Sequence, residues 1–215
     1  MHNGLVRRPY GAILWVLNVQ YFAMQAAAAL VWATSYSWAN NTISDLGNTH
    51  CGLYGGRYVC SPFHTAMNIS LVAAGLTIIS GALLLQSRLA GNLTARLGFT
   101  CMALAGAGSV LVGVFPENSI SSLHTTGAAL SFILGNLGMI VIGAALGGLP
   151  KMLRVYTVLS GIIGFTALVF FMKNTYLGIG IGGMERIVSY PQTLWMIIFG
   201  VYLLADYRKR KRANI

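Results

Sequence analysis

Six long apolar runs, none with a Lys or Arg near its middle, alternate with shorter polar stretches along the chain. A helix of about 20 apolar residues crosses roughly 30 Å of hydrocarbon. Backbone groups in lipid must bond within their own segment, and these runs lack the strict alternation of barrel strands. The pattern therefore predicts an all-α, six-helix polytopic bundle that forms one membrane domain over residues 1–215. The predicted spans are about 11–33, 63–86, 97–115, 123–146, 155–172 and 187–205.

The composition supports a membrane protein. Hydrophobic residues make up 56% of the chain and charged residues only 8%, whereas charged residues are roughly 25% of an average soluble domain. Four acids and fourteen bases cannot cover a soluble surface of this size. Soluble enzymes and nucleic-acid-binding domains are therefore excluded.

The basic residues predict the orientation, because short cytoplasmic loops are enriched in Lys and Arg. Between the predicted spans, one side of the membrane carries Arg7, Arg8, Arg88, Arg96, Lys151, Arg154, Arg208, Lys209, Arg210, Lys211 and Arg212. The other side carries Arg57, Lys173 and Arg186. We therefore expect a multi-pass protein of the cell membrane with both termini in the cytoplasm. The run 208–212 predicts contact with anionic headgroups at the cytoplasmic face, and the net charge of +10 then reflects topology and not nucleic-acid binding.

Most acids and histidines fall on the predicted outer side, close to the ends of the spans. They are Asp45, His50, His64, Glu117, His124 and Glu185. Ionisable groups near the bilayer are costly, so their common depth predicts a convergent outer pocket. The alternative is a ring of polar residues that faces lipid headgroups.

Three short motifs carry these residues. The first is Ile43-Ser44-Asp45-Leu46-Gly47, whose Ser44 or Asp45 is suited to cap a short re-entrant helix. The second is Gly113-Val114-Phe115-Pro116-Glu117, with His124 seven residues on. The third is Gly183-Met184-Glu185-Arg186, followed by Tyr190-Pro191 and Trp195. In their order and spacing the three motifs resemble the domain of unknown function 998 family of six-helix prokaryotic membrane proteins. The resemblance covers most of the chain and implies six helices and these outer motifs, but it assigns no reaction.

The cysteines suggest a covalent link. Cys51 and Cys60 lie in the long outer loop, in an oxidising compartment, which predicts a disulfide. The alternative is a metal site formed with His50 and His64, although the spacing matches no zinc pattern. Cys101 falls inside the third span and is expected to be a small buried apolar residue.

The outer cluster leads to one main functional hypothesis, a hydrolase or transferase of a lipid or lipid-linked substrate at the outer leaflet. Carboxylates and imidazoles suit acid–base work or metal binding, and a histidine can activate a serine. Candidate catalytic residues are Asp45, Glu117, His124 and Glu185, with Ser44 as nucleophile. Candidate substrate-binding residues are Arg186, Tyr190, His64 and Asn41. A divalent metal such as zinc has Asp45, His64 and His124 as candidate ligands.

Three other functions stay open. The protein could be a non-catalytic lipid-binding or membrane assembly factor, whose acids and bases form structural pairs. It could be a small-solute transporter, although no inverted repeat is visible. It could bind haem or a quinone through His64 and His124, although haem usually needs histidines inside the bundle. The sequence names neither the substrate nor the oligomeric state.

Overall fold

The computed structural model describes residues 9–213 of the chain. Arg7 and Arg8, which belong to the predicted cytoplasmic charge, lie outside the described residues. The helices and strands follow in chain order: α1 Tyr10–Val16, α2 Val19–Leu30, the 3₁₀ helix η1 Ser44–Gly47, β1 Gly52–Tyr54, β2 Arg57–Val59, α3 His64–Leu89, α4 Leu93–Val114, α5 Ser121–Ala129, the π-helical segment η2 Leu130–Leu134, α6 Gly135–Ala145, α7 Lys151–Met172 and α8 Gly180–Ala213.

The six predicted spans are confirmed. Six helical stretches of the described chain are long and apolar enough to cross a membrane, so the protein is a multi-pass membrane protein. Several helices extend beyond their apolar part, because hydropathy marks the hydrocarbon segment and not the turns outside it. The largest difference is α8, which begins at Gly180 and not near residue 187. The backbone N–H groups of Gly182 and Gly183 donate to the carbonyl of Ala39, and this contact holds the first turn.

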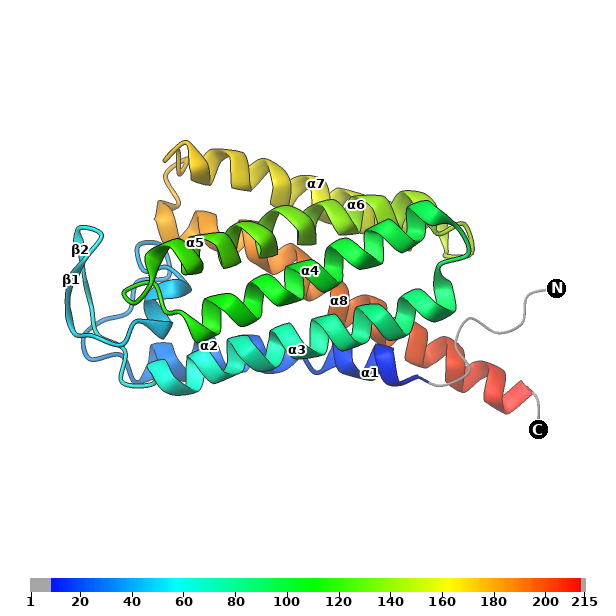
Figure 1. The fold of residues 1–215 in the computed structure, drawn as a ribbon, viewed down its shortest axis with the longest axis horizontal. Helices are drawn as coiled ribbons and strands as arrows, with labels where there is room; N and C mark the ends of the chain where they lie inside the picture. The colour runs from blue at the N-terminus through cyan, green and yellow to red at the C-terminus, as the bar shows by residue number, and fades with distance from the viewer. Residues whose placement is uncertain (1–8, 214–215) are drawn as a thin grey trace.

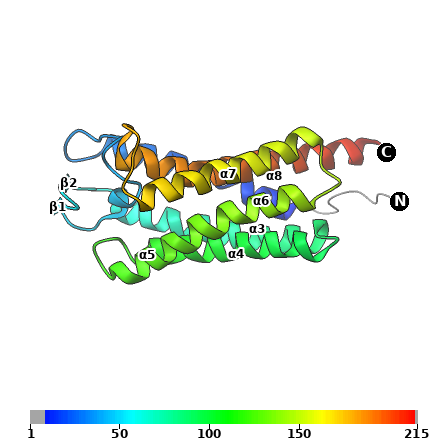
Figure 2. The same cartoon turned by 90° about the horizontal axis from the view of Figure 1, so that it is seen from above.

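The spans run alternately up and down and place all connections at two ends of an elongated bundle (Figures 1 and 2). One end holds β1, β2, η1 and the α4–α5 and α7–α8 connections, and we call it the hairpin end. The start of α1 and the end of α8 lie together at the opposite end (Figure 1). The fold therefore brings segments 40–60, 115–124 and 180–190 to the same end of the molecule.

The first span is broken at Leu17 and Asn18, between α1 and α2. A break inside lipid frees backbone carbonyls that need new partners. The fully buried Asn18 supplies them, because its Nδ2 donates to the carbonyls of Leu14 (3.2 Å) and Trp15 (3.3 Å). A polar side chain thus stabilises an irregular turn in the interior.

Aromatic side chains fill the middle of the bundle. Trp15 is fully buried, with ring centroids 5.2 Å from Trp195, 5.8 Å from Phe199 and 6.0 Å from Phe99. The Trp195 indole Nε1 donates to Thr157 Oγ1 at 2.8 Å, which satisfies its one polar atom. This cluster ties α1, α4, α7 and α8 together.

Glycines allow α4 to approach its neighbours closely. A Cβ atom added at Gly108 would press on the backbone carbonyl of Gly127, and one at Gly106 would press on that of Gly75. Lipid gives helices no hydrophobic reason to associate, so such close backbone contact supplies much of the packing energy. The glycine-rich face thus holds α4 between α3 and α5.

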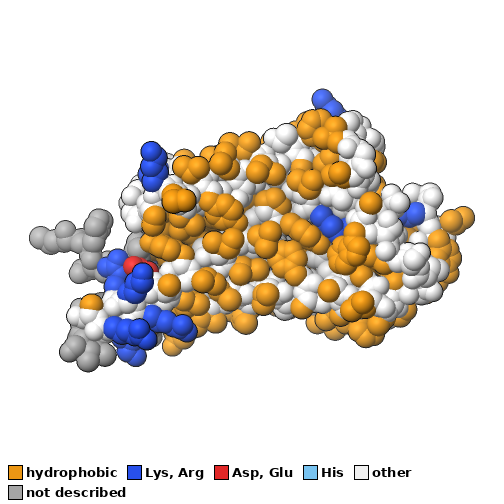
Figure 3. All heavy atoms as spheres, turned by 180° about the vertical axis from the view of Figure 1, so that it is seen from behind, with side chains coloured by type: hydrophobic (Ala, Val, Ile, Leu, Met, Phe, Trp, Pro, Cys, Tyr) orange, Lys and Arg blue, Asp and Glu red, His pale blue; other side chains and the backbone are white. Residues whose placement is uncertain are grey.

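Apolar side chains cover the face of the molecule between its two ends, and Lys and Arg gather where α8 ends (Figure 3). Among the described residues, Arg57, Lys173 and Arg186 are the bases of the hairpin end. The one ion pair of the other end joins Arg210 Nε to Asp206 Oδ2 at 2.8 Å, within the described chain. Exposed large apolar side chains lie on α1, α2, α3, α4, α6, α7 and α8, so the spans together form the apolar belt that a bilayer requires.

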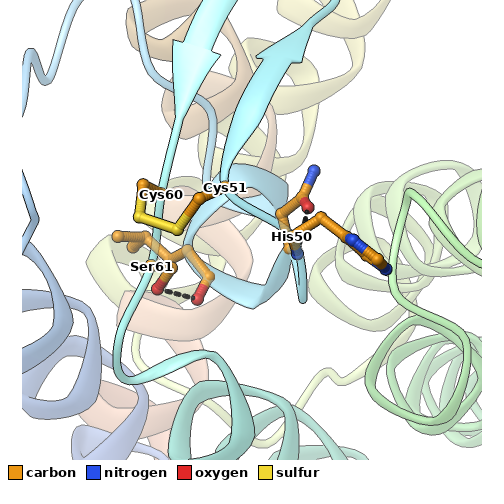
Figure 4. The surroundings of a disulfide bond; sticks show 6 residues. His50, Cys51, Cys60 and Ser61 are labelled. Carbon is orange, nitrogen blue, oxygen red and sulfur yellow. Dashed lines mark hydrogen bonds between the residues drawn. A yellow bond between two sulfur atoms is a disulfide. The ribbon is translucent and has the colours of Figure 1, made fainter.

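A small hairpin closes one end of the bundle. β1 and β2 pair antiparallel, and Gly55 and Gly56 form the two-residue turn with φ values of 55° and 78°, which glycine adopts readily. The predicted disulfide between Cys51 and Cys60 is confirmed at the base of the hairpin (Figure 4). The His50 ring points away from the two sulfur atoms (Figure 4). The cysteines are therefore a cross-link and not the metal site of the alternative interpretation.

Candidate active site

Five of the predicted site residues lie together at the hairpin end, buried or half-buried. They are Ser44 and Asp45 of η1, Glu117 of the α4–α5 connection, His124 of α5 and Glu185 of α8. No more than 8% of Asp45, Glu117, His124 or Glu185 is exposed. The ring of headgroup-facing residues, the alternative to a pocket, does not describe these four side chains.

Ser44 and His124 form the contact with the clearest chemical meaning. Ser44 Oγ lies 3.1 Å from His124 Nε2, and the other ring nitrogen, Nδ1, lies 2.8 Å from the carbonyl oxygen of Phe115. A carbonyl only accepts, so Nδ1 carries the proton of this hydrogen bond. In a neutral ring Nε2 is then free to accept the serine proton. This is the geometry of a nucleophile, its base and a group that orients the base.

Glu185 contacts the same serine from the opposite side. Its Oε1 lies 3.2 Å from Ser44 Oγ, and its Oε2 accepts a hydrogen bond from the backbone N–H of Ile43. A carboxylate on the second turn of α8 thus holds the segment that leads into η1. The residue is 4% exposed, so these contacts replace most of its hydration.

The Ser44 hydroxyl has one proton but two neighbours that can accept it. Both contacts are hydrogen bonds at the same time only when the chain Glu185–Ser44–His124 holds one additional proton. That proton sits either on Glu185, with Ser44 donating to His124, or on His124, with Ser44 donating to Glu185. The two arrangements have the same net charge, so the hydroxyl can pass a proton between the acid and the base.

Asp45, a predicted catalytic acid, is enclosed by hydrogen bonds. Arg57 of β2 donates two hydrogen bonds of 2.6 Å to its carboxylate, from Nε to Oδ2 and from Nη2 to Oδ1. Oδ2 also accepts from the Thr42 backbone N–H (2.9 Å) and from Asn41 Nδ2 (3.2 Å). Thr42 Oγ1 in turn accepts from the Asp45 N–H at 3.0 Å, as in a capping box. Asp45 therefore anchors η1 and joins it to the hairpin.

Glu117, in the α4–α5 connection, lies close to the Asp45 carboxylate. Its Oε1 accepts from Asn48 Nδ2 at 2.9 Å, and its backbone carbonyl accepts from the Tyr54 hydroxyl at 2.7 Å. Burial, and next the negative charge of Asp45, raise the pKa of Glu117 to about 8. Protonation of this carboxyl group is therefore favoured relative to that of a solvent-exposed glutamate.

Arg186 binds backbone groups. Its Nη1 donates to the carbonyls of Trp38 (2.9 Å), Asn41 (2.8 Å) and Gly182 (2.8 Å), and its Nη2 donates to the Tyr36 hydroxyl. The guanidinium carbon lies 4.8 Å from the Trp38 ring centroid. These contacts fix the 36–41 segment on the first turns of α8. In this structure the Nη atoms of Arg186 are thus engaged by the protein itself.

The remaining predicted residues lie outside this cluster or support it. His64 is half-buried at the start of α3, and its Nδ1 lies 3.2 Å from the neighbouring Thr65 Oγ1. The Tyr190 hydroxyl donates to Gln25 Oε1 at 2.8 Å. In the described chain, no group of three His, Cys, Asp or Glu side chains is arranged to hold a metal ion. The structure therefore does not gather Asp45, His64 and His124 into the predicted zinc site.

A cavity of about 50 Å³ begins directly below Ser44 and Glu185 and continues into the bundle. Its lining includes Ser189, Gln192 and Thr193 of α8 and Asn18 at the break of the first span. Ser44 therefore faces both the acid–base groups and an interior space.

Sequence reasoning missed Arg57 and Gln192. Arg57 is the only Lys or Arg of the long loop between the first two spans. It lies on the same predicted side as Asp45, Glu117 and Glu185, and this was a usable charge signal. Gln192 gave no such signal, because an amide inside a span usually bonds a neighbouring helix.

Most of the chain, including the residues of this site, matches a known protein family. A family model described as "Protein of unknown function (DUF998)" matches residues 16–202, which is most of the chain. The chain belongs to this family. No curated protein and no solved structure matches it. In this DUF998 protein the matched region contains the Ser44–His124 pair, Glu185 and the whole lining of the cavity.

Proposed function

We propose that this DUF998 protein is a membrane-embedded hydrolase or transferase, with Ser44 as nucleophile and His124 as general base. The observation that carries the proposal is the 3.1 Å contact between Ser44 Oγ and His124 Nε2. It lies within the range expected for an activated nucleophile. The Phe115 carbonyl supports it by fixing the proton on Nδ1, the role that a carboxylate has in a serine triad.

The reaction would proceed through an acyl–Ser44 ester. Ser44 Oγ attacks the carbonyl carbon of an ester, and its proton passes to His124 Nε2. His124 gives this proton to the oxygen of the leaving alcohol. Water or a second alcohol then loses a proton to His124 and attacks the acyl carbon, and the proton returns to Ser44 Oγ as the serine leaves.

The proposed substrate is an ester of a lipid or a lipid-linked molecule at the outer leaflet. Ser44 lies at the hairpin end of the spans, close to the level of the interfacial region that borders the hydrocarbon core. The wide apolar belt (Figure 3) brings lipid directly to the bundle. A substrate that partitions into the bilayer needs no aqueous cleft of its own.

The proposed orientation places the hairpin end outside and both termini in the cytoplasm of a cell. Nine described bases lie at the opposite end or in its connections: Arg88, Arg96, Lys151, Arg154, Arg208, Lys209, Arg210, Lys211 and Arg212. This asymmetry favours a cytoplasmic location for that end. The disulfide of the hairpin favours an oxidising compartment for the other. The basic end of α8 would then contact anionic headgroups of the inner leaflet.

A second candidate is a non-catalytic lipid-binding or assembly factor. The specific observation in its favour is that Asp45 and Arg186 are engaged by protein groups. In that function Ser44, His124 and Glu185 would only fasten η1 to α5 and α8. The two candidates differ in one measurable property, the nucleophilic reactivity of Ser44.

The test is covalent labelling of the detergent-purified full chain with a lipophilic fluorophosphonate probe. We expect Ser44 to be labelled, Ser44→Ala to abolish labelling, and His124→Ala to slow it by about 100-fold, because a general base typically contributes 10²–10⁴-fold. Ser119→Ala is the matched control, since Ser119 is an exposed serine of the same end. Equal thermal unfolding midpoints would show that the variants fold. Failure to label Ser44 in the folded wild-type protein would leave the non-catalytic function.

A further inference from the structure

The cavity below Ser44 is lined by polar side chains along one face of α8. Glu185, Ser189 and Gln192 follow at intervals of four and three residues, so all three project from the same side of the helix. Ser131 of the π-helical segment η2 and Asn18 lie elsewhere in the lining. The remaining walls are largely apolar, with Leu71, Ile78 and Phe132 among them, so the α8 face is the part of the lining that can bind a small polar molecule.

Gln192 is the side chain of this lining with the largest capacity for further hydrogen bonds. It is 6% exposed, and none of the hydrogen bonds within residues 9–213 involves its side chain. In the described chain, the fully enclosed side-chain atoms without a partner belong to Gln25, Asn68, Asn136 and Arg186 and not to Gln192. The Gln192 amide therefore still touches open space, where it can form hydrogen bonds. The neighbouring Ser189 differs, since its Oγ lies 3.0 Å from the Tyr21 hydroxyl. A small hydrogen-bonding molecule in the cavity would satisfy Gln192.

The size of the cavity limits what that molecule is. A volume of about 50 Å³ accommodates a few water molecules. It is too small for a sugar, a glycerol backbone or a lipid headgroup. Ser44 is part of the lining, and His124 Nε2, which is not, lies 3.1 Å from Ser44 Oγ. A water molecule beside Ser44 would therefore be close to the base once an acyl group has been transferred.

We propose that this cavity holds the water that cleaves the acyl–Ser44 ester, so that the second substrate is water and the reaction is a hydrolysis. This proposal rests on the proposed function. A water molecule at the top of the cavity gives one proton to His124 Nε2, and its oxygen attacks the acyl carbon. The bond to Ser44 Oγ breaks, the proton moves from His124 to Ser44 Oγ, and a free carboxylic acid leaves. Gln192 is a positioning residue, because it orders the water and does not touch the reacting atoms.

The water itself is tested without any activity. Hydroxyl radicals made by X-ray radiolysis oxidise side chains that contact bound water. We expect oxidation of Tyr21, which is 6% exposed but lines the cavity. Trp15, which is buried in the aromatic core, serves as the internal control. Gln192→Met keeps the length of the side chain but removes its polar atoms, and it should lower Tyr21 oxidation several-fold. Equal oxidation of Tyr21 and Trp15 in the wild-type protein would overturn the proposal.

The use of the water is tested by separating the two half-reactions. In Gln192→Met, labelling of Ser44 by the fluorophosphonate should stay within about twofold of wild type. Ester turnover should fall at least tenfold, and an acyl–Ser44 adduct should accumulate in intact-mass spectra. Gln86→Met replaces an amide near the C-terminal end of α3, at the opposite end of the bundle from Ser44, and should behave as wild type. Rescue of turnover by Gln192→Asn would show that the amide is what matters.

Three results would count against the inference, and each is distinguishable. Unchanged turnover in Gln192→Met after loss of Tyr21 oxidation would show that the cavity water is not the nucleophile. Transfer of the acyl group to added glycerol in greater yield than free acid would show a transferase. Absence of Ser44 labelling in the wild-type protein would overturn the proposed function together with this inference. Labelling of Ser44 together with Tyr21 oxidation no greater than that of Trp15 would overturn this inference alone.

Discussion

Ser44 Oγ and His124 Nε2 lie 3.1 Å apart although 80 positions separate the two residues in the chain. They meet because Glu185 and Asp45 hold η1 against the start of α5. Glu185 accepts from the Ile43 N–H just before η1, and Asp45 ties η1 to Arg57 of the hairpin. The reactivity proposed for Ser44 therefore depends on two buried acids that have different tasks.

Glu185→Gln should keep Ser44 reactive, and Glu185→Leu should not. A glutamine oxygen can still accept from the Ile43 N–H, and its NH₂ group can donate to Ser44 Oγ. The serine proton is then directed to His124. Leucine leaves the Ile43 N–H without a partner, at a cost of about 1–3 kcal/mol in unfolding free energy. Fluorophosphonate labelling rates and thermal unfolding of both variants test this.

We expect Glu185→Gln to label within about threefold of wild type, and Glu185→Leu to label at least tenfold more slowly, because an unrestrained serine loses its alignment with the base. If Glu185→Gln were as slow as Glu185→Leu, the carboxyl group itself would be the essential acid or base. The role assigned here to Glu185, that of holding and orienting Ser44, would then be wrong.

Removal of Arg57 should destabilise the hairpin end strongly. Arg57→Met leaves the Asp45 carboxylate, which is fully buried, without its cation. Breaking such a pair by removing one partner costs about 3–5 kcal/mol. The loss should appear as a lower unfolding midpoint in detergent and as faster proteolysis between Asn48 and Ser61.

The double variant Asp45→Asn/Arg57→Met separates charge from packing. The neutral amide needs no cation, so the double variant should be more stable than Arg57→Met alone, with a coupling of about 1–3 kcal/mol in a double-mutant cycle. Additive losses would mean that Asp45 and Arg57 do not interact in the native protein. Lys173 is an exposed base of the same end and provides the control. Lys173→Met should change the free energy of unfolding by less than about 0.5 kcal/mol.

Much of this architecture follows from sequence, because lipid leaves few choices. Uncharged apolar runs must be helices, and their number decides which loops share an end of the bundle. The common location of Ser44, His124 and Glu185 follows from that count. Their individual roles do not follow, since they depend on partners that loop geometry selects. Asp45 illustrates this, because its role is decided by a hairpin that brings Arg57 back to it.

The start of α8 shows the limit of hydropathy more sharply. Glu185 and Arg186 look like loop residues before an apolar helix, yet both lie inside the helix that begins at Gly180. Gly180, with φ of 77°, closely approaches the Ala39 carbonyl, and a window of mean hydropathy contains no information on such a contact. The polar first turns of a membrane helix are thus the part where sequence periodicity fails.

Stability should fall as the pH rises from about 4.5 to about 8, because of Glu117. Burial, with the Asp45 charge as a second cause, raises its pKa from 4.5 to about 8. The folded protein therefore binds this proton more tightly than the unfolded chain does. The resulting stability is complete below about pH 4.5, declines as the pH increases, and is lost above about pH 8.

Glu117→Gln should remove this decline, because the amide stays neutral and can still accept from Asn48 Nδ2. The measurement is the unfolding midpoint of both proteins in detergent between pH 5 and pH 9. We expect the wild-type midpoint to drop relative to that of Glu117→Gln as the pH rises. Parallel curves would show that Glu117 is ionised in the folded protein throughout this range.

The orientation can be tested with the two ends of a single helix. α7 begins at Lys151 and is followed directly by Lys173, and both lysines are exposed. In a Cys101→Ala background the remaining two cysteines form the disulfide. A cysteine at either lysine position is then the only free thiol. We expect a membrane-impermeant maleimide to label Lys173→Cys in intact cells, because the bases of the Lys151 end should hold that end in the cytoplasm.

Lys151→Cys is the matched control and should react only after the membrane has been permeabilised. The reverse pattern would place the hairpin end in the cytoplasm. The disulfide would then face a reducing compartment that opposes it, and a substrate in the outer leaflet could not reach Ser44. Labelling of both positions in intact cells would show mixed insertion, in which case the charge difference between the two ends does not determine the topology.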